Sequence, residues 1–286
     1  MAEHLINIAP TISIIVPCYN QAQYLSETLQ SVLEQEYQYW ECIIVNDGSP
    51  DNTEEIAKRW VEKDSRFKYF KKENSGVADT RNYGIKQAEG DYILPLDGDD
   101  KIDSKYIQKA LEIFSHDNET KLVYSNLILF DAKDEKLILQ DYSYKNMLVE
   151  NQIFVSAIFR RTDFLNTAGF NPNMTAGLED WDFWLTFLKA EDKVVKINEF
   201  LFFYRIKANS RSTSINKEKN ERLLLQIFKN HVPLYLEYFN PIRDHIEADF
   251  YKKESDMYKK STEYKIGRII LYPIRCVQKA LRKIFS

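Results

Sequence analysis

The stretch that decides the fold is residues 92–100, which read YILPLDGDD. Its first five residues form an apolar run typical of a buried strand, and three carboxylates follow within the next four residues. Neighbouring carboxylates raise one another's pKa values unless a cation lies between them, and their oxygens are the ligands that Mg²⁺ and Mn²⁺ prefer. We therefore predict a strand that ends at a metal site formed by Asp97 and Asp99. The alternative is an acidic turn that caps a helix starting near Ser104.

The chain before this stretch alternates between short β-branched apolar runs and segments with helical spacing, which is typical of βαβ units and a mainly parallel sheet. Ligands bind such sheets beyond the carboxyl ends of the strands, and a polar cluster follows every predicted strand here. The predicted strands are 12–16, 42–45, 67–70 and 92–96, and the predicted helices are 24–35, the segment that Thr53 caps, and 78–88.

The polar clusters contain three further candidates for binding a nucleotide. Asp47 follows the second strand and offers hydrogen-bond acceptors to a base or ribose, while Tyr19 follows the first strand and offers a stacking surface. Arg81 lies in the first turn of a helix, where free N–H groups already favour anions. The alternatives are a turn at Asp47, simple strand termination at Tyr19, and an exposed salt bridge from Arg81 to Asp79 or Glu89.

A second acidic cluster, GLEDWDFW, occupies residues 177–184. A carboxylate whose pKa is raised by apolar neighbours can act as a general base toward a sugar hydroxyl. The alternative is an ordinary helix start, where acids favour the helix dipole and the tryptophans fill the core. From residue 101 onward the alternation is less regular. We predict helices at 105–114 and 178–189, strands at 122–125, 154–159 and 194–197, and a hairpin formed by 127–130 and 136–139. We divide the chain into residues 1–100 and 101–212 as the two halves of one α/β domain, and 213–286 as a helical segment.

Composition excludes several classes of protein. A net charge of -4 argues against a nucleic-acid binder, and only four histidines leave little support for a histidine-rich metal site. The P-loop, GxGxxG, GxSxG and HExxH motifs do not occur. No apolar run is long enough to span a membrane and the first ten residues do not resemble a secretory signal, so we expect a cytoplasmic protein.

The last 22 residues, 265–286, combine six Lys or Arg with no acidic residue, and their apolar residues fall on one helical face. This pattern suits a helix on an anionic membrane surface, which would place the protein on the inner face of the membrane. A helix packed on the protein or on a partner is an equally good interpretation.

The ordered motifs together resemble the inverting glycosyltransferases of family 2, which have the GT-A fold, a mostly parallel, Rossmann-like sheet flanked by helices. The resemblance covers roughly residues 10–210 and rests on SIIVPCYN at 13–20, IIVNDGS at 43–49, the helix opening at 74–85, DGDD at 97–100 as the DxD motif, and Glu179-Asp180 as the ED motif.

The resemblance implies that residues 1–100 are the nucleotide-sugar-binding half of the domain and 101–212 the acceptor-binding half, and it implies a role for each matching residue. Pro17, Tyr19 and Asp47 would hold the nucleoside, Arg81 would lie near the donor, Asp97 would contact ribose or metal-bound water, and Asp99 would ligate Mn²⁺ or Mg²⁺. Asp180 would be the catalytic base, with Glu179 and Trp181 shaping the acceptor pocket. Residues 204–212 resemble a flexible loop that closes on the diphosphate. Many relatives carry histidine where Lys207 or Ala208 stands here, so Arg205, Lys207 or Arg211 would neutralise phosphate charge instead.

The sequence therefore predicts a metal-dependent inverting glycosyltransferase with a C-terminal helical appendage. It would move sugar from a nucleotide-diphosphate-sugar, UDP-sugar favoured, to a glycan or lipid-linked hydroxyl in cell-surface polysaccharide biosynthesis. The alternatives are a non-catalytic module that binds a nucleotide-sugar or glycan, and a nucleotidyltransferase, which would need a glycine-rich basic signature that residues 17–23 lack.

Overall fold

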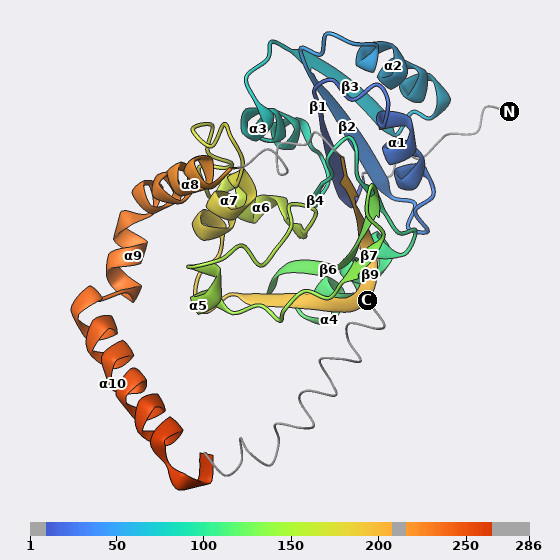
Figure 1. Ribbon diagram of the computed structural model, residues 1–286. Coiled ribbons are helices and arrows are strands. Elements are labelled where there is room, and N and C mark those ends of the chain that lie inside the picture. The colour runs from blue at the N-terminus through green and yellow to red at the C-terminus, as the bar shows by residue number, and fades with distance from the viewer. Residues whose placement is uncertain (1–9, 208–215, 265–286) are drawn as a thin grey trace, which may run out of the picture. The chain divides into compact units, whose positions relative to one another are not determined.

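The computed structural model describes residues 10–207 and 216–264, and it forms two compact units, the first ending at His231 and the second beginning at Val232 (Figure 1). The first unit is built on a sheet with the strand order β3-β2-β1-β4-β8-β6-β9-β5, in which β7 pairs with β6 at one side. Most of the paired length is parallel, and helices cover both faces. The predicted α/β class is confirmed.

The first half of the sheet follows the predicted alternation closely. Its strands β1, β2, β3 and β4 are mutually parallel, and α1, α2 and α3 connect them. Thr53 is the first residue of α2 and not its cap, because its hydroxyl donates to Asp51 and accepts from the backbone of Gln21. The bounds are β1 (Ile12–Cys18), α1 (Leu25–Leu33), β2 (Trp40–Asp47), α2 (Thr53–Lys63), β3 (Phe67–Lys72), α3 (Val77–Gln87) and β4 (Tyr92–Pro95).

Alternate residues of β1 face opposite layers, which explains its unbroken apolar sequence. Ile12, Ile14 and Val16 belong to the core shared with α1 and α2, whereas Ile15 faces α3. Gly84 of α3 lies so close that an added Cβ would come within 2.5 Å of Ile15 Cγ2. Glycine at this position therefore lets α3 rest directly on the sheet, and α3 carries Arg81.

The second half of the sheet departs from the predictions. Two strands predicted at 122–125 and 127–130 form one strand, a strand predicted at 154–159 covers only three residues, and a short strand predicted at 194–197 extends over fourteen. The hairpin between β6 and β7 is confirmed. The bounds are β5 (Lys101–Ile102), α4 (Tyr106–His116), β6 (Thr120–Asp131), β7 (Glu135–Leu137), α5 (Tyr144–Met147), β8 (Ile158–Arg160), α6 (Arg161–Leu165), α7 (Glu179–Phe187) and β9 (Lys193–Ile206).

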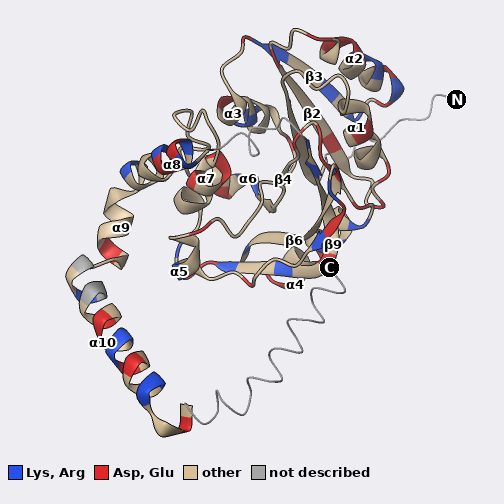
Figure 2. Cartoon of the chain, in the orientation of Figure 1, with Lys and Arg blue, Asp and Glu red and all other residues tan. Residues whose placement is uncertain are grey.

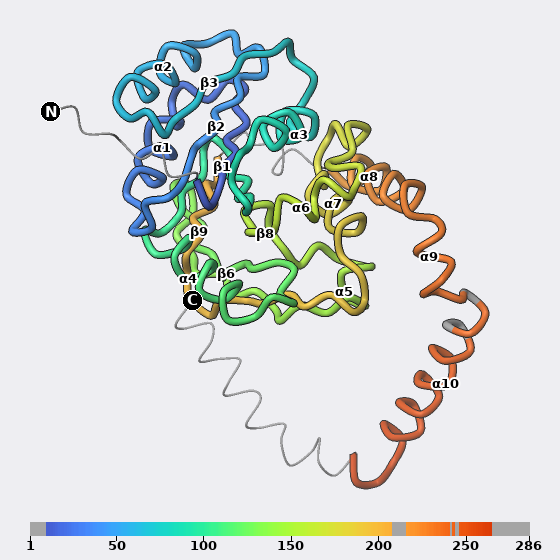
Figure 3. Tube along the Cα trace, turned by 180° about the vertical axis from the view of Figure 1, so that it is seen from behind, coloured from blue at the N-terminus to red at the C-terminus, as the bar shows by residue number. Residues whose placement is uncertain are grey.

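Helix α8 (Lys217–Asn230) belongs to the first unit and lies beside α7 in both views (Figures 1 and 3). Helix α8 buries Leu223 and Ile227, and its C-terminal end also makes polar contacts: Asn230 Nδ2 donates to buried Asp182 at 2.6 Å, and His231 Nε2 lies 3.0 Å from the same oxygen. The first compact unit thus extends past residue 212, where the sequence analysis divides the chain.

The second unit contains α9 (Val232–Tyr238) and α10 (Pro241–Lys260). Figure 2 shows that basic and acidic residues alternate along α10, and the helix also exposes apolar side chains such as Ile246 and Phe250. No helix within residues 10–207 and 216–264 is long and apolar enough to cross a membrane. The proposed membrane-surface segment, residues 265–286, lies outside the described residues.

Candidate functional site

A cavity of about 510 Å³ opens at the carboxyl ends of the parallel strands. It brings together the polar clusters that follow β1, β2, β3 and β4, which are far apart in the sequence. Its lining residues are Pro17, Cys18, Tyr19, Asn20, Gln21, Asp47, Asn74, Gly76, Val77, Thr80, Asp97, Gly98, Asp99 and Lys207.

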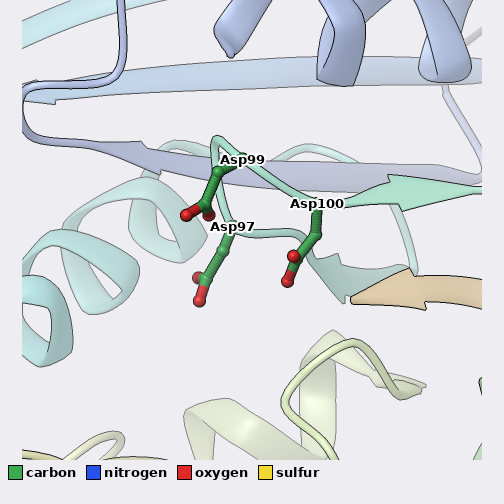
Figure 4. A group of neighbouring side chains, drawn as sticks. All are labelled: Asp97, Asp99 and Asp100. Carbon is green, nitrogen blue, oxygen red and sulfur yellow. The ribbon is translucent and has the colours of Figure 1, made fainter. Parts of the chain in front are cut away.

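The three carboxylates after β4 lie close together (Figure 4), and two of them, Asp97 and Asp99, line the cavity. Asp97, Asp99 and Asp100 each offer an oxygen, and these oxygens lie within 4.8 Å of one another. Asp100 is buried, and its burial together with the charges of Asp99 and Asp97 raises its pKa well above the usual value. Asp97 and Asp99 remain partly accessible from the cavity, so the donor set fits a hard divalent cation.

Two basic residues at the end of β9 hold this acidic turn. Lys207 lines the cavity and forms an ion pair with Asp99. Arg205 lies in the strand and not in a loop, and it donates from its backbone N–H to Asp100 at 2.8 Å and from Nε to the carbonyl of Asp99 at 2.7 Å. The rest of its guanidinium bonds to Glu27 and Asp131. Arg211 lies outside the described residues.

Asp47 organises the turn that opens α3. Its Oδ1 accepts from Lys72 Nζ at 2.7 Å and from the backbone of Ser75 at 3.0 Å, and its Oδ2 accepts from the backbone of Gly76 at 2.9 Å. Both carboxylate oxygens are therefore engaged within the protein, and Asp47 is only 3% exposed. Tyr19, by contrast, is 52% exposed at the rim and free to stack on a flat ring.

Arg81 joins the two acidic clusters of the sequence. Its side chain is 1% exposed, Nη2 donates to Asp97 at 2.6 Å, and Nη1 donates to Glu179 at 3.0 Å. The expected alternative, a surface salt bridge to Asp79 or Glu89, is wrong, since those acids pair with Lys72 and Lys68. One buried cation thus fixes the distance between the DxD turn and the start of α7.

Asp180 lies in the first turn of α7, where the preceding backbone turns sharply. Gly177 and Leu178 both have positive φ, of 128° and 60°, and the second is unusual for a side chain of this shape. Burial, and then the charge of Glu179, raises the pKa of Asp180 to about 6, although the charge of Arg81 opposes the rise. A carboxylate with this pKa can accept a proton near neutral pH.

The side chains of Glu179 and Trp181 are buried and contact other parts of the protein. Glu179 is 6% exposed and bonds to Arg81, while Trp181 is 5% exposed and donates its Nε1–H to the carbonyl of Met147 at 2.7 Å. Trp184 likewise donates its Nε1–H to the carbonyl of Ile153 at 2.9 Å. Both tryptophans therefore anchor the chain between α5 and β8 to α7, which agrees with the core interpretation of these rings.

Sequence reasoning missed Asn151, which lies in that anchored chain and donates to Asp180. It also missed the role of Lys72 at Asp47. Neither residue belongs to a motif, and the only signal was Lys72 standing at the end of a predicted strand close to the candidate edge.

The chain is similar to a protein family and to several known proteins. The family model described as "Glycosyl transferase family 2" matches residues 13–177. An uncharacterized glycosyltransferase of Haemophilus influenzae is 34% identical over 217 residues, covering 74% of this chain and 84% of that protein. The minor teichoic acid biosynthesis protein GgaB of Bacillus subtilis is 30% identical over 79% of this chain, which spans only 28% of the length of GgaB.

Two solved structures share the fold at low sequence identity. TarS of S. aureus in complex with UDP-GlcNAc has a TM-score of 0.59 at 17% identity, covering 77% of this chain and 72% of that one. The mannosyltransferase PcManGT of Pyrobaculum calidifontis in complex with GDP-Man and Mn²⁺ has a TM-score of 0.57 at 16% identity, covering 96% and 88%. With a family model over more than half of its length and a relative aligned over most of both proteins, this chain, which has the GT-A fold, is a glycosyltransferase that belongs to glycosyl transferase family 2.

Proposed function

We propose that this chain is a metal-dependent inverting glycosyltransferase that moves a sugar from a nucleotide-diphosphate-sugar, UDP-sugar favoured, to the hydroxyl of a glycan or lipid-linked acceptor. The observation that carries the proposal is the connection between the two acidic clusters. Arg81 bonds to Asp97 at the cavity wall and to Glu179, the neighbour of Asp180. A donor in the cavity would therefore have its sugar directed toward a carboxylate suited to proton removal.

The residues divide the work of transfer between them. Tyr19 would stack on the base, and Asp97 and Asp99 would hold Mn²⁺ or Mg²⁺, which supplies charge stabilisation to the leaving diphosphate. Lys207, released from Asp99, would contact the same phosphates. Asp180 would take the proton from the acceptor hydroxyl as that oxygen attacks the anomeric carbon from the opposite face. The configuration at that carbon would invert.

Relatives support the donor class and the biological setting. The TarS structure contains UDP-GlcNAc, the PcManGT structure contains GDP-Man with Mn²⁺, and GgaB is named for minor teichoic acid biosynthesis. We extend these to a role in cell-surface polysaccharide biosynthesis for this chain.

Thermal unfolding with UDP, GDP, dTDP and CMP, each with and without Mn²⁺, tests the donor site. A ligand at about 100 times its dissociation constant adds about 2.7 kcal/mol, which moves the melting temperature by a few degrees. We expect one nucleotide to stabilise the protein only with Mn²⁺, and Asp99→Ala to remove the effect. Asp134→Ala, an exposed aspartate in the β6–β7 turn, is the matched control. Stabilisation by no nucleotide would favour the non-catalytic alternative.

We also propose that residues 265–286 hold the protein on the inner face of the membrane, because their charge and apolar pattern fit an anionic surface. Co-sedimentation with vesicles of phosphatidylglycerol, compared with phosphatidylcholine, measures this binding. We expect the full chain to bind the anionic vesicles and residues 1–264 to remain in solution, and equal partitioning of both forms would contradict the proposal.

A further inference from the structure

Asn151 donates from Nδ2 to Asp180 Oδ2 at 2.9 Å, and no motif of the sequence singles this residue out. The other oxygen of the same carboxylate, Oδ1, accepts from the backbone N–H of Trp181 at 2.8 Å. Each oxygen therefore has one uncharged donor and keeps a second lone pair for another hydrogen. With a donor on each oxygen, the carboxylate plane has a defined orientation.

Asn151 is exposed, yet its position is fixed from three sides. Trp181 Nε1 holds the carbonyl of Met147 before it, and Trp184 Nε1 holds the carbonyl of Ile153 after it. Its own Oδ1 accepts from the backbone N–H of Ile153 at 3.3 Å. Because both tryptophans belong to α7, the helix that carries Asp180 also holds the segment that orients Asp180.

We propose that Asn151 is a positioning residue for Asp180, which it keeps oriented and ionised for proton removal from the acceptor. The proposal rests on the proposed function, in which Asp180 is the base. A hydrogen bond to the ionised form favours that form, and here it opposes burial and the charge of Glu179. The charged groups that act on Asp180 are Glu179 on its own helix and Arg81 on α3, whose charge is shared with Asp97.

Two substitutions change the contact between residue 151 and Asp180 in different ways. Asn151→Leu removes both the donor to Asp180 and the acceptor for Ile153. Asn151→Asp keeps the acceptor for Ile153 and replaces the donor with a negative charge. The matched control is Glu150→Gln, which changes the charge of the adjacent exposed residue.

Carbon-13 NMR of protein labelled at the aspartate carboxyls measures the titration of Asp180 directly, with Asp180→Asn identifying its signal. We expect the midpoint to rise by about 1 pH unit in Asn151→Leu, at least as far in Asn151→Asp, and to stay unchanged in Glu150→Gln. An unchanged midpoint in Asn151→Leu would overturn the proposal. So would an unchanged midpoint in Asn151→Asp, because a carboxylate at residue 151 raises the midpoint by repulsion alone if that side chain faces Asp180.

The rate of nucleoside diphosphate release, measured with sugar conjugates of the nucleotide that the thermal experiment selects, tests the catalytic consequence. We expect kcat of Asn151→Leu to fall about fivefold at pH 6 and to recover most of that loss above pH 8, with KM unchanged. A rise in KM alone would mean that Asn151 contacts the acceptor, which overturns the positioning role. If Asp180→Asn keeps the wild-type rate, the base assignment fails, whereas the NMR result on Asn151 still decides the hydrogen bond.

Discussion

The two acidic clusters of this chain contain similar residues in different surroundings. Two carboxylates after β4 form ion pairs, Asp97 with Arg81 and Asp99 with Lys207. Asp180, at the start of α7, accepts hydrogen bonds from two uncharged donors and has a raised pKa. At Asp97 and Asp99 a metal ion can replace a side-chain cation. At Asp180 the carboxylate can instead take up and release a proton. Surroundings, more than residue type, separate a metal site from a base.

The comparison is tested most severely by Asp180→Asn. This change removes the proton acceptor but keeps the shape of the side chain, so we expect the transfer rate to fall by about 10²–10⁴-fold. Nucleotide binding with Mn²⁺, measured by calorimetry, should stay within about twofold because the cavity carboxylates are untouched. A variant that transfers sugar at the wild-type rate would show that the second cluster is not the base.

Arg81→Leu tests the link between the clusters. Two carboxylates, those of Asp97 and Glu179, would lose their buried partner, and we expect the free energy of unfolding to drop by about 3–5 kcal/mol. Urea denaturation measures the change. Arg59→Leu, which breaks an exposed pair with Glu55, should cost less than about 1 kcal/mol. Equal losses in both variants would mean that the bridge contributes no more than a surface pair.

The raised pKa of Asp180 predicts opposite trends for stability and activity. The folded state holds the proton up to about pH 6, whereas the unfolded chain releases it near pH 4. The contribution of Asp180 to stability is therefore largest below about pH 4 and is lost as pH rises to about 6, while the active carboxylate appears. Above pH 6 we expect Asp180→Asn to be more stable than wild type by about 1–2 kcal/mol, after allowance for partial exposure, with the difference vanishing below pH 4. A difference that is independent of pH would contradict this assignment.

The smallest expected effect belongs to Lys207→Ala. Because the Lys207 ammonium occupies Asp99, a metal ion must displace it, and its removal should tighten Mn²⁺ binding by roughly three- to tenfold. Electron paramagnetic resonance of free Mn²⁺ gives the affinity, with the exposed Lys58→Ala as control. Weaker Mn²⁺ binding in Lys207→Ala would mean that lysine supports the cation site and does not compete with it.

Sequence predicted the features that depend on local pattern. The strands β1 to β4 are short runs bounded by turn residues, so their parallel arrangement and the cavity at their ends follow from the βαβ rule. Asp97 and Asp99 are visible because they follow a buried strand directly. The family, its fold and its class of enzyme followed from the order of these motifs.

Features that depend on distant partners could not be predicted in this way. Nothing near Arg81 indicates a bond to Glu179, which is 98 residues away. The fourteen residues of β9 mix charged and aromatic side chains, so only the apolar start of that strand was recognisable. The inward direction of Trp181 depends on the carbonyl of Met147, an acceptor that no sequence pattern marks.

The irregular register between β6 and β9 makes the site depend on the exact number of residues in β9. Ser125 pairs with Ile197 and Leu127 with Phe202, so two steps along β6 match five along β9. Successive side chains of a strand point to opposite faces of the sheet. The three extra residues in β9 therefore decide which β9 side chain points toward Asp99. Loss of one residue from 198–201 would put Ile206 in the place of Arg205, and loss of two would put Lys207 there. The length of the segment 198–201 thus sets which side chain meets the acidic turn.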